Sequence, residues 1–309
     1  MSKHESFSRD REYSLLMNRY QSIIPDPQSF KEVINTPLPK SFWFNSLKVD
    51  PSEYTSVLAE EGMSVRSMPW CIDGFRLQSA EVLGRSWLYR VGLIQIQEEV
   101  SMLPGYILDP KPGERVLDLC AAPGNKTSQL SVLMQNTGVL VANDINYNRL
   151  KALGSSIRRL GLININLTVN NGVHFPVEEA YFDKILVDAP CSCEGTLRKN
   201  NTRNMQFTQS NSEHIAETQI ALMKKAYRLL RPGGLLVYST CTFAPEENEA
   251  VVDTLIKYSK GKMKCIPITL GNFNYHPGLD QWQGRNYHSS LRYAWRIWPE
   301  LNNTGGFFV

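Results

Sequence analysis

The sequence predicts a doubly wound α/β domain with a mostly parallel sheet, preceded by a small α+β subdomain. Five short β-rich runs alternate with longer helical patterns after residue 109, and such alternation produces parallel strands joined by crossover helices. The strands are almost continuously apolar and end in Asp, Cys or Thr, where ligands of such sheets bind. The predicted strands are 115–120, 139–144, 165–169, 184–190 and 235–240, with helices around 127–136, 146–160, 211–230 and 246–259.

Two shorter segments precede this domain. Residues 10–24 predict a helix that ends at Pro25, and four prolines divide 25–39, which we expect to be a connecting segment. A strand, a helix and two further strands are expected between Phe42 and Leu77, and a helix over 97–108 leads into the main domain. The expected units are a helical extension with linker (1–38), the α+β subdomain (39–95) and the main domain (96–309).

Composition excludes several classes of protein. The chain has 309 residues, 42% hydrophobic and 20% charged, which excludes an intrinsically disordered chain. No apolar run approaches the roughly 18 residues of a membrane-spanning helix, and residues 1–14 lack the apolar core of a secretory signal. Six cysteines are too few for a disulfide scaffold of this length. We therefore expect a cytoplasmic enzyme with free thiols, and a net charge of +3 permits a nucleic-acid partner.

The loop after the first predicted strand has the composition of a ligand-binding loop. Its small residues, two alanines and Gly124, allow the backbone to approach a ligand beside a helix N-terminus. A phosphate-binding Walker loop would need glycines where this chain has Cys120 and Asn125. Asp144 closes the second strand, where a doubly wound fold positions a carboxylate for ribose hydroxyls. The pattern suits a nucleoside without a pyrophosphate, such as S-adenosylmethionine; an ordinary tight turn with a surface Asp is the alternative.

Two cysteines follow the last two predicted strands. Cys191 lies in DAPCSCEG and Cys241 in STCTFAPEENE, and adjacent strand ends open onto one crevice, so both thiols could face one ligand. Cys191 and Cys193 have neither CxxC spacing nor a neighbouring His/Cys pair, so no metal site is expected. A Cys191–Cys241 disulfide formed by oxidation stays open. The other cysteines, for which packing is the expected role, are Cys71, Cys120, Cys193 and Cys265.

Three motifs in this order, DLCAAPGNKT, DAPCSCEGT and YSTCTFAPEENE, resemble the RNA cytosine-5 methyltransferase family, the Sun/Fmu group. The similarity extends over 95–309 and is strongest to bacterial ribosomal-RNA members of the RsmB/RsmF kind. The NSLKV…PWCIDGF region also resembles their small RNA-binding-like subdomain. The resemblance implies a class I S-adenosylmethionine-dependent methyltransferase with a Rossmann-like fold, acting on structured RNA, ribosomal RNA being favoured over transfer RNA. It further implies a monomer with no membrane or metal partner.

The resemblance also implies residue roles. Carbon 5 of cytosine becomes nucleophilic only after a thiolate attacks carbon 6, which is covalent catalysis. By resemblance Cys241 is this nucleophile, Cys191 assists product release, Asp188 binds the cytosine edge, and Lys126 lies near the methyl donor or the base. The positions implied for the cofactor are Cys120, Ala121, Ala122, Pro123, Gly124, Asn125, Lys126, Asp144, Arg149, Asn171 and Asp188.

The chain departs from the family pattern at three of its motif positions. Asn125 replaces the second glycine of the cofactor loop, Asn171 stands where many members have an adenine-binding aspartate, and Cys193 replaces a glycine or similar small residue. Because of Asn125 and Asn171, a non-catalytic RNA-binding assembly factor that retains the cofactor fold is one alternative. A DNA cytosine-5 methyltransferase, with Cys191 as nucleophile, is another, which the TC cysteine and the lack of a large insertion after DAPC disfavour.

Two stretches without acidic residues are candidate RNA contacts. One, 195–212, follows the DAPC motif and carries Arg198, Lys199 and Arg203, which fit phosphate contacts beside the site. The other, 281–299, combines arginines with aromatic residues, and its alternating pattern over 291–297 predicts a strand. By resemblance to the family's RxxP motif, Arg296 is expected to line the RNA-binding face.

Overall fold

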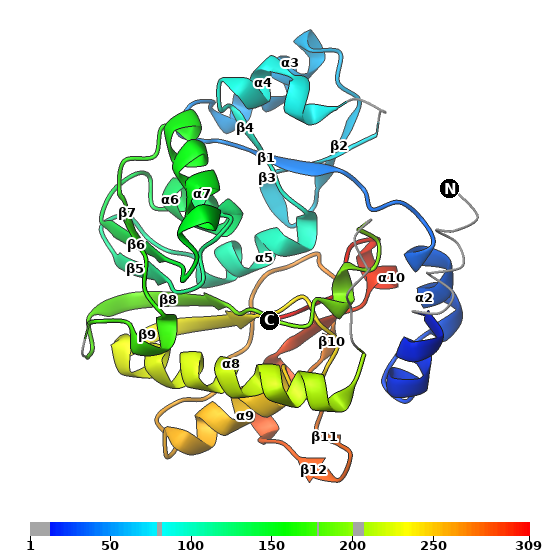
Figure 1. The fold of residues 1–309 in the computed structure, drawn as a ribbon. Coiled ribbons are helices and arrows are strands. Elements are labelled where there is room, and N and C mark those ends of the chain that lie inside the picture. Colours follow the sequence, from blue (N-terminus) through cyan, green and yellow to red (C-terminus); the bar gives the residue numbers. More distant parts are fainter. Residues whose placement is uncertain (1–12, 79–81, 178, 200–206) are drawn as a thin grey trace.

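The main domain is built on a five-stranded sheet in which every neighbouring pair is parallel. The computed structural model describes residues 13–78, 82–177, 179–199 and 207–309 (Figure 1). The order of strands reverses at the central strand, which opens a crevice at its carboxyl end. In sheet order the strands are β7 (Ile165–Thr168), β6 (Val139–Asn143), β5 (Arg115–Asp118), β8 (Phe182–Asp188) and β9 (Leu230–Ser239). The predicted doubly wound class is confirmed.

Helices cover both faces of this sheet because its strands are apolar on both faces. Along β8, Leu186 packs into the core shared with one group of helices, whereas Ile185 and Val187 pack into the core on the opposite face. The first group is α5 (Glu99–Leu108), α6 (Asn125–Leu133) and α7 (Tyr147–Leu160); the second is α8 (Gln209–Leu229) and α9 (Glu249–Tyr258) (Figure 1).

The C-terminal segment extends the sheet beyond the end of β9. Thr240 bridges antiparallel to Phe308, so the last residues of the chain lie beside the strand that leads to Cys241. The strand expected over 291–297 is shorter than predicted, because 289–293 form a 3₁₀ helix and only the last three residues are extended. The elements are β10 (His276–Pro277), β11 (Gln281–Trp282), β12 (Arg285–Asn286), β13 (Trp295–Ile297), α10 (Pro299–Asn302) and β14 (Phe307–Phe308).

A four-stranded antiparallel sheet forms the small subdomain. Its order is β2-β3-β1-β4, and the expected strand–helix–strand–strand order is present with one further helix and strand. Phe44 stacks on Tyr54 at 4.2 Å between ring centroids, which holds the helix against the sheet. The elements are β1 (Ser41–Phe44), α3 (Tyr54–Glu60), β2 (Val65–Met68), β3 (Cys71–Leu77), α4 (Trp87–Arg90) and β4 (Ile94–Ile96).

The proline-rich segment near the N-terminus contains a helix, which corrects the expected connecting segment. In α2 (Pro27–Ile34), Asp26 caps the first turn by accepting from the Ser29 backbone N–H, and Pro27 occupies the first helical position, where it is tolerated. The helical residues 13–20 and α2 lie on the side of the molecule where α10 is found (Figure 1), and Phe30 of α2 packs against Trp298 of the main domain. Within the described ranges no helix has the length and apolar character to cross a bilayer.

Candidate active site

Three thiols meet beyond the carboxyl ends of β8 and β9. Cys191 follows β8 and Cys241 follows β9, and their sulfur atoms lie 3.4 Å apart. Cys193, on the same loop as Cys191, places its sulfur 4.0 Å from that of Cys191. All three are free cysteines, and Cys193 is the exposed one. The structure therefore brings the two predicted cysteines to one crevice, as expected for adjacent strand ends, and adds a third.

Side-chain hydrogen bonds hold the two cysteine-bearing loops together. Ser192 Oγ lies 2.7 Å from Thr242 Oγ1, which donates to Glu194 Oε2 at 3.0 Å. The backbone N–H of Gly195 donates to the carbonyl oxygen of Cys241 at 2.8 Å. These bonds join residues next to each cysteine, so the spacing of the sulfurs is fixed by the loops rather than by the thiols themselves.

The pKa values of the three thiols are shifted in different directions. The hydrogen bond from Cys191 lowers the pKa of Cys193, with further help from the Lys199 and Arg149 cations. The same hydrogen bond to Cys193 raises the pKa of Cys191. At Cys241 the bond from Cys191 lowers the pKa, but the bond to Cys193 and burial outweigh it, so that the pKa is raised. The pKa is therefore lowered at the exposed thiol, Cys193, and raised at Cys191 and Cys241.

A lysine–aspartate pair joins α6 to the end of β8, the strand that leads to Cys191. Lys126 Nζ donates to Asp188 Oδ2 at 2.7 Å and to Ser101 Oγ at 3.1 Å, and Ser239 Oγ donates to Asp188 Oδ1 at 2.7 Å. The Asp188 side chain is 30% exposed, so part of its carboxylate faces the crevice. This arrangement fixes the orientation of a carboxylate that can accept a hydrogen bond from a ligand.

The loop between β5 and α6 is shaped for close backbone approach. Gly124 has φ +108°, and a Cβ there would lie 2.5 Å from Leu153 Cδ1, so only glycine fits. The Ala122 N–H donates to Asp144 Oδ2 at 3.1 Å, and Arg149 Nη2 donates to the Ala122 carbonyl oxygen at 2.6 Å. The loop, Asp144 and Arg149 therefore lie together, as predicted for a nucleoside site.

Two buried groups support this loop. Thr127 Oγ1 donates to Asp118 Oδ2 at 2.7 Å, and burial raises the pKa of Asp118 to about 7. Asn125 Oδ1 accepts from Gln95 Nε2 at 2.8 Å, which ties the loop to the small subdomain.

Burial raises the pKa of Cys120, which fits a packed thiol. Asn171 Oδ1 accepts the Val173 N–H at 3.0 Å and caps a 3₁₀ turn, so that oxygen is engaged within the protein.

Comparison with known proteins identifies the same family as the sequence motifs. Residues 105–309 match the family model of the 16S rRNA methyltransferase RsmB/F, and residues 14–99 match the N-terminal domain of 16S rRNA methyltransferase RsmF. The chain belongs to this methyltransferase family. The family and the enzyme class expected from the motifs are thereby confirmed.

Individual relatives agree with this family. The tRNA (cytosine(49)-C(5))-methyltransferase of Pyrococcus abyssi is 37% identical over 296 residues, which is 95% of this chain and 94% of that protein. Ribosomal RNA small subunit methyltransferase F of Vibrio cholerae is 37% identical over 93% of this chain and 60% of its own length. A methyltransferase homolog from Pyrococcus horikoshii superposes with a TM-score of 0.84 at 33% identity, covering 100% of this chain and 98% of that one.

Two of the arginines expected to contact RNA are buried in this family member, which corrects that expectation. Arg198 is 4% exposed and donates to the carbonyl oxygens of Thr304 and Pro37 at 2.8 Å each. Arg296 is 4% exposed and forms a buried ion pair with Glu249. Both guanidinium groups are used within the protein, so neither presents an edge to a phosphate.

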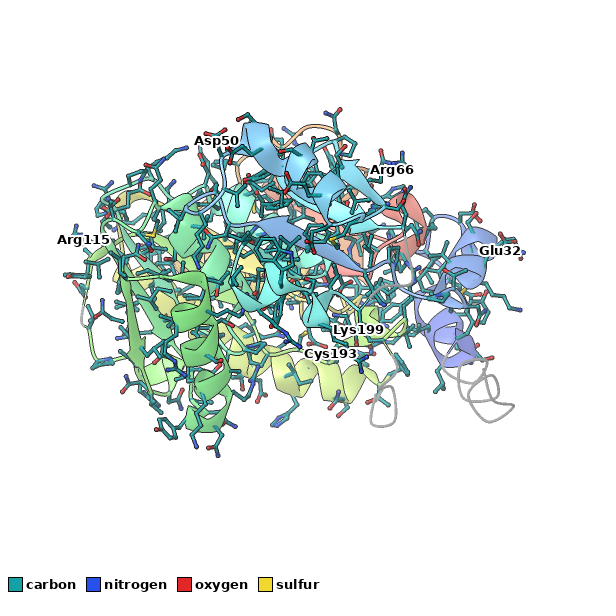
Figure 2. The ribbon with its side chains drawn as sticks, turned by 90° about the horizontal axis from the view of Figure 1, so that it is seen from above. Glu32, Asp50, Arg66, Arg115, Cys193 and Lys199 are labelled. Atoms are coloured by element: carbon teal, nitrogen blue, oxygen red, sulfur yellow. The ribbon has the colours of Figure 1, made fainter. Side chains whose placement is uncertain are left out.

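The other two basic residues of the acid-free loop have different outcomes. Lys199 is 49% exposed and lies beside Cys193, where it pairs with Glu98 (Figure 2). It stays a candidate phosphate contact. Arg203 lies outside the described residues, so its predicted role is not addressed by the structure.

Sequence reasoning missed a buried polar group behind the cysteines. Glu194 is fully buried and accepts from Tyr20 Oη at 2.8 Å and from Arg19 Nη1 at 3.3 Å. Burial raises the pKa of Glu194 to about 7. The available signal was a glutamate inside the DAPCSCEGT motif, but its partners Tyr20 and Arg19 lie more than 170 positions away in the sequence, in the segment expected to be an extension.

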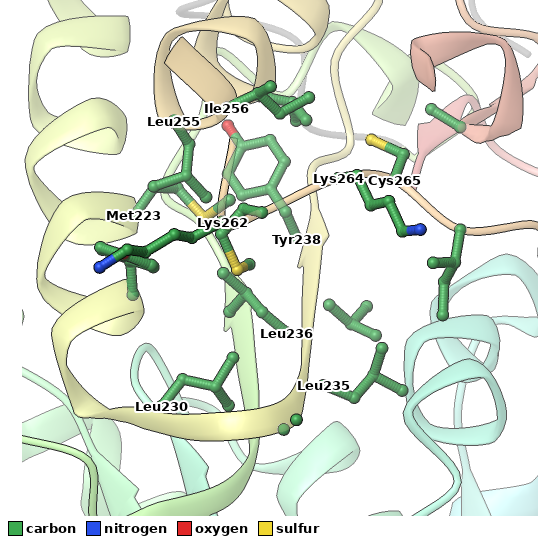
Figure 3. Close-up of a pocket in the computed structure, with 18 of the residues that line it drawn as sticks. Met223, Leu230, Leu235, Leu236, Tyr238, Leu255, Ile256, Lys262, Lys264 and Cys265 are labelled. Atoms are coloured by element: carbon green, nitrogen blue, oxygen red, sulfur yellow. The ribbon is translucent and has the colours of Figure 1, made fainter. Parts of the chain in front are cut away.

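A cavity of about 870 Å³ lies along β9, and none of the three clustered cysteines lines it. Leu230, Leu235 and Leu236 line it together with Met223 and Leu255 from the two covering helices (Figure 3). Its lining is mostly apolar and extends along β9 from Leu230 to Tyr238, whereas Cys241 follows the strand's end and is not part of the lining. The reactive groups of this family member therefore lie outside this cavity.

Proposed function

We propose that this protein transfers a methyl group from S-adenosylmethionine to carbon 5 of a cytosine in structured RNA. The observation that carries the proposal is the 3.4 Å separation of the Cys191 and Cys241 sulfurs beside the Lys126–Asp188 pair. A nucleophile, a second thiol that can move a proton, and an oriented carboxylate are the groups that cytosine-5 chemistry requires. A non-catalytic RNA-binding protein would need none of them in this arrangement.

The residues around the loop between β5 and α6 fit the cofactor. The Asp144 carboxylate is 5% exposed and is oriented by the backbone N–H groups of Ala122 and Asn146, so that it can accept from ribose hydroxyls. The small-residue loop and Arg149 complete the wall on that side. When bound, S-adenosylmethionine supplies the electrophilic methyl group. RNA is the polymer partner and the cytoplasm is the proposed location.

The protein's own groups carry the remaining steps. Cys241 first gives its thiol proton to solvent; the thiolate then attacks carbon 6 of the cytosine, a C–S bond forms, the C5–C6 π bond breaks and carbon 5 becomes nucleophilic. Asp188, held by Lys126, accepts hydrogen bonds from the base edge and stabilises the ring as its charge changes. After methylation, carbon 5 gives its proton to solvent, the electrons of that C–H bond re-form the C5–C6 double bond, and the Cys241 sulfur leaves as a thiolate. Cys191 is the thiol placed to assist this release.

The target base must leave its stack to reach two loops at a sheet edge, which RNA loops permit at low cost. Ribosomal RNA is the favoured substrate, because the small subdomain matches an N-terminal domain of a 16S rRNA methyltransferase. Transfer RNA is the second candidate, because a relative that this chain covers almost end to end is named as a tRNA methyltransferase. Bisulfite sequencing of both RNAs with and without the protein distinguishes them.

The direct test is transfer of tritiated methyl groups from S-adenosylmethionine to RNA from cells that lack the protein. We expect label at cytosine carbon 5 with the wild-type chain and none above background with Cys241→Ala, because the covalent step is lost. Cys265→Ser, a cysteine remote from the site, is the matched control and should label normally. Label that persists in Cys241→Ala would contradict the assigned nucleophile.

A further inference from the structure

A third thiol that the proposed reaction does not use lies with the two reacting cysteines. The sulfurs of Cys191, Cys193 and Cys241 all lie within 4.8 Å of one another. Across the described ranges of the chain, this is the one group of three or more His, Cys, Asp or Glu side chains with ligand atoms so close together. Two loops, 50 residues apart in sequence, supply the sulfurs, which is why motif spacing predicted no metal site.

We propose that Cys191, Cys193 and Cys241 form a binding site for a thiophilic cation, Zn²⁺ in the first place. Zinc binds thiolate sulfur at about 2.3 Å in a tetrahedron, which separates neighbouring sulfurs by about 3.8 Å. The two hydrogen-bonded pairs, at 3.4 and 4.0 Å, lie on either side of that value. Thiolates select zinc and copper(I) over the oxygen-seeking Mg²⁺ and Ca²⁺. Three protein ligands leave the fourth position to water.

The backbone at Cys193 supports a role for its sulfur. Cys193 has φ +61°, the left-handed region in which a residue with a Cβ is disfavoured by about 1–2 kcal/mol. Glycine, which the related motif has at this position, would avoid that strain. A cysteine in this conformation brings a third sulfur to the pair at an energetic cost, which indicates that the sulfur itself is used. Cys193 is also exposed, so an ion can reach it from solvent.

The charges around the three sulfurs suit a bound cation. Three thiolates and one Zn²⁺ form a complex with a net charge of minus one, and the protons still held by the sulfurs leave to the buffer. Lys199 and Arg149 act electrostatically on Cys193 and offset that remaining charge. Figure 2 shows the side chains of Cys193 and Lys199 next to each other. The loop hydrogen bonds described above preset the sulfur positions, so little rearrangement is needed.

Metal binding would occupy the sulfur that attacks cytosine. Zinc bonded to the Cys241 sulfur draws electron density from it and blocks its approach to carbon 6, so we expect the metal-bound protein to be inactive in methyl transfer. This consequence rests on the proposed function; the binding of the ion does not.

The test is a titration of the reduced, metal-free full chain with Co²⁺, followed by calorimetry with Zn²⁺, in the absence of RNA and S-adenosylmethionine. We expect one ion per chain, intense sulfur-to-cobalt charge-transfer absorption, and visible bands of tetrahedral Co²⁺. Cys193→Gly, which suits the positive φ, should weaken Zn²⁺ binding at least about tenfold, because one of three ligands is lost. Cys193→Ser, which keeps the Cβ, should do the same, and Cys265→Ser should bind as wild type.

The result that overturns the proposal is Zn²⁺ affinity that is unchanged in both Cys193 variants, with circular dichroism showing that they are folded. In a second arm, Zn²⁺ should inhibit methyl transfer by the wild type, EDTA should reverse this, and Cys193→Gly should need at least about tenfold more Zn²⁺. If the chain binds Zn²⁺ but transfers no methyl group even when it is metal-free, the proposed function alone is contradicted. Methyl transfer without Zn²⁺ binding would contradict the metal site alone.

Discussion

At the residue scale, the site depends on side chains whose orientation is fixed by neighbours. Asp188 is the clearest case: Lys126 and Ser239 each occupy one of its oxygens at 2.7 Å, and its remaining exposed edge faces the crevice. The cysteines are controlled in the same way, since the loop bonds of Ser192 and Thr242 set their spacing. A change at one such residue alters the chemistry with little effect on the fold.

Asp188→Asn should lower the kcat for methyl transfer by about 10²–10³-fold, because the amide cannot stabilise the changing charge of the base. The side chain keeps its size, so the unfolding midpoint should stay close to that of the wild type. Steady-state tritium transfer measures kcat and KM. Asp109→Asn, at an exposed residue outside the crevice, is the matched control; an equal loss of kcat in both variants would contradict the role of Asp188.

At the scale of elements, the strand-end loops carry the function and the strands and helices position them. The strands were predictable because their apolar runs are long and end in polar residues; all five end within two residues of the expected position, although β9 begins five residues earlier than predicted. Proline content alone did not predict α2. A proline inside a helix breaks it, whereas Pro27 at the first helical position and Pro25 before the helix are both compatible with one.

The cofactor loop gives the element-scale prediction. Gly124→Ala should destabilise the protein by about 1–3 kcal/mol, because its φ of +108° and the contact with Leu153 both exclude a Cβ. Binding of S-adenosylmethionine should weaken in the same variant, since the loop must shift. Urea denaturation and calorimetry measure the two effects. Gly271→Ala, where a Cβ would meet nothing within 4 Å, should stay within about 0.5 kcal/mol of the wild type.

At the scale of the whole molecule, the N-terminal helices are attached to the active-site loops through buried charges. Arg19 pairs with both Glu194 and Glu246, and its side chain is only 9% exposed. Aromatic contacts between Phe30 and Phe243 extend the same interface. Sequence patterns predicted the local elements and the motif cysteines, but not this attachment, because no periodicity relates residues that lie more than 170 positions apart.

Sequence patterns also misplaced two arginines for a general reason. Arg198 and Arg296 lie in acid-free stretches, which is typical of phosphate-binding segments, but their partners are carbonyl oxygens and a glutamate from other parts of the chain. Local charge composition does not reveal such distant partners. The cysteine cluster also depends on residues that are distant in the sequence, because only the parallel pairing of β8 and β9 brings Cys241 to Cys191 and Cys193.

Arg19→Met should destabilise the protein by about 3–5 kcal/mol, because it leaves Glu194 and Glu246 without their buried cation. Urea denaturation measures the loss of stability. Lys111→Met, in the exposed pair with Asp109, is the control and should change stability by less than about 1 kcal/mol. Equal stabilities of the Arg19 variant and the wild type would show that the N-terminal helices are not held by this ion pair.

The proposed covalent bond between Cys241 and the target cytosine is tested most directly in the Cys191→Ala variant. Without the thiol that assists release, the reaction should stop at the methylated, enzyme-linked base. Incubation with S-adenosylmethionine and substrate RNA should then give a denaturation-resistant protein–RNA adduct, and mass spectrometry after nuclease and protease digestion should place the methylated cytosine on the peptide that contains Cys241. An adduct on another residue, or none while Cys191→Ala turns over normally, would contradict the account.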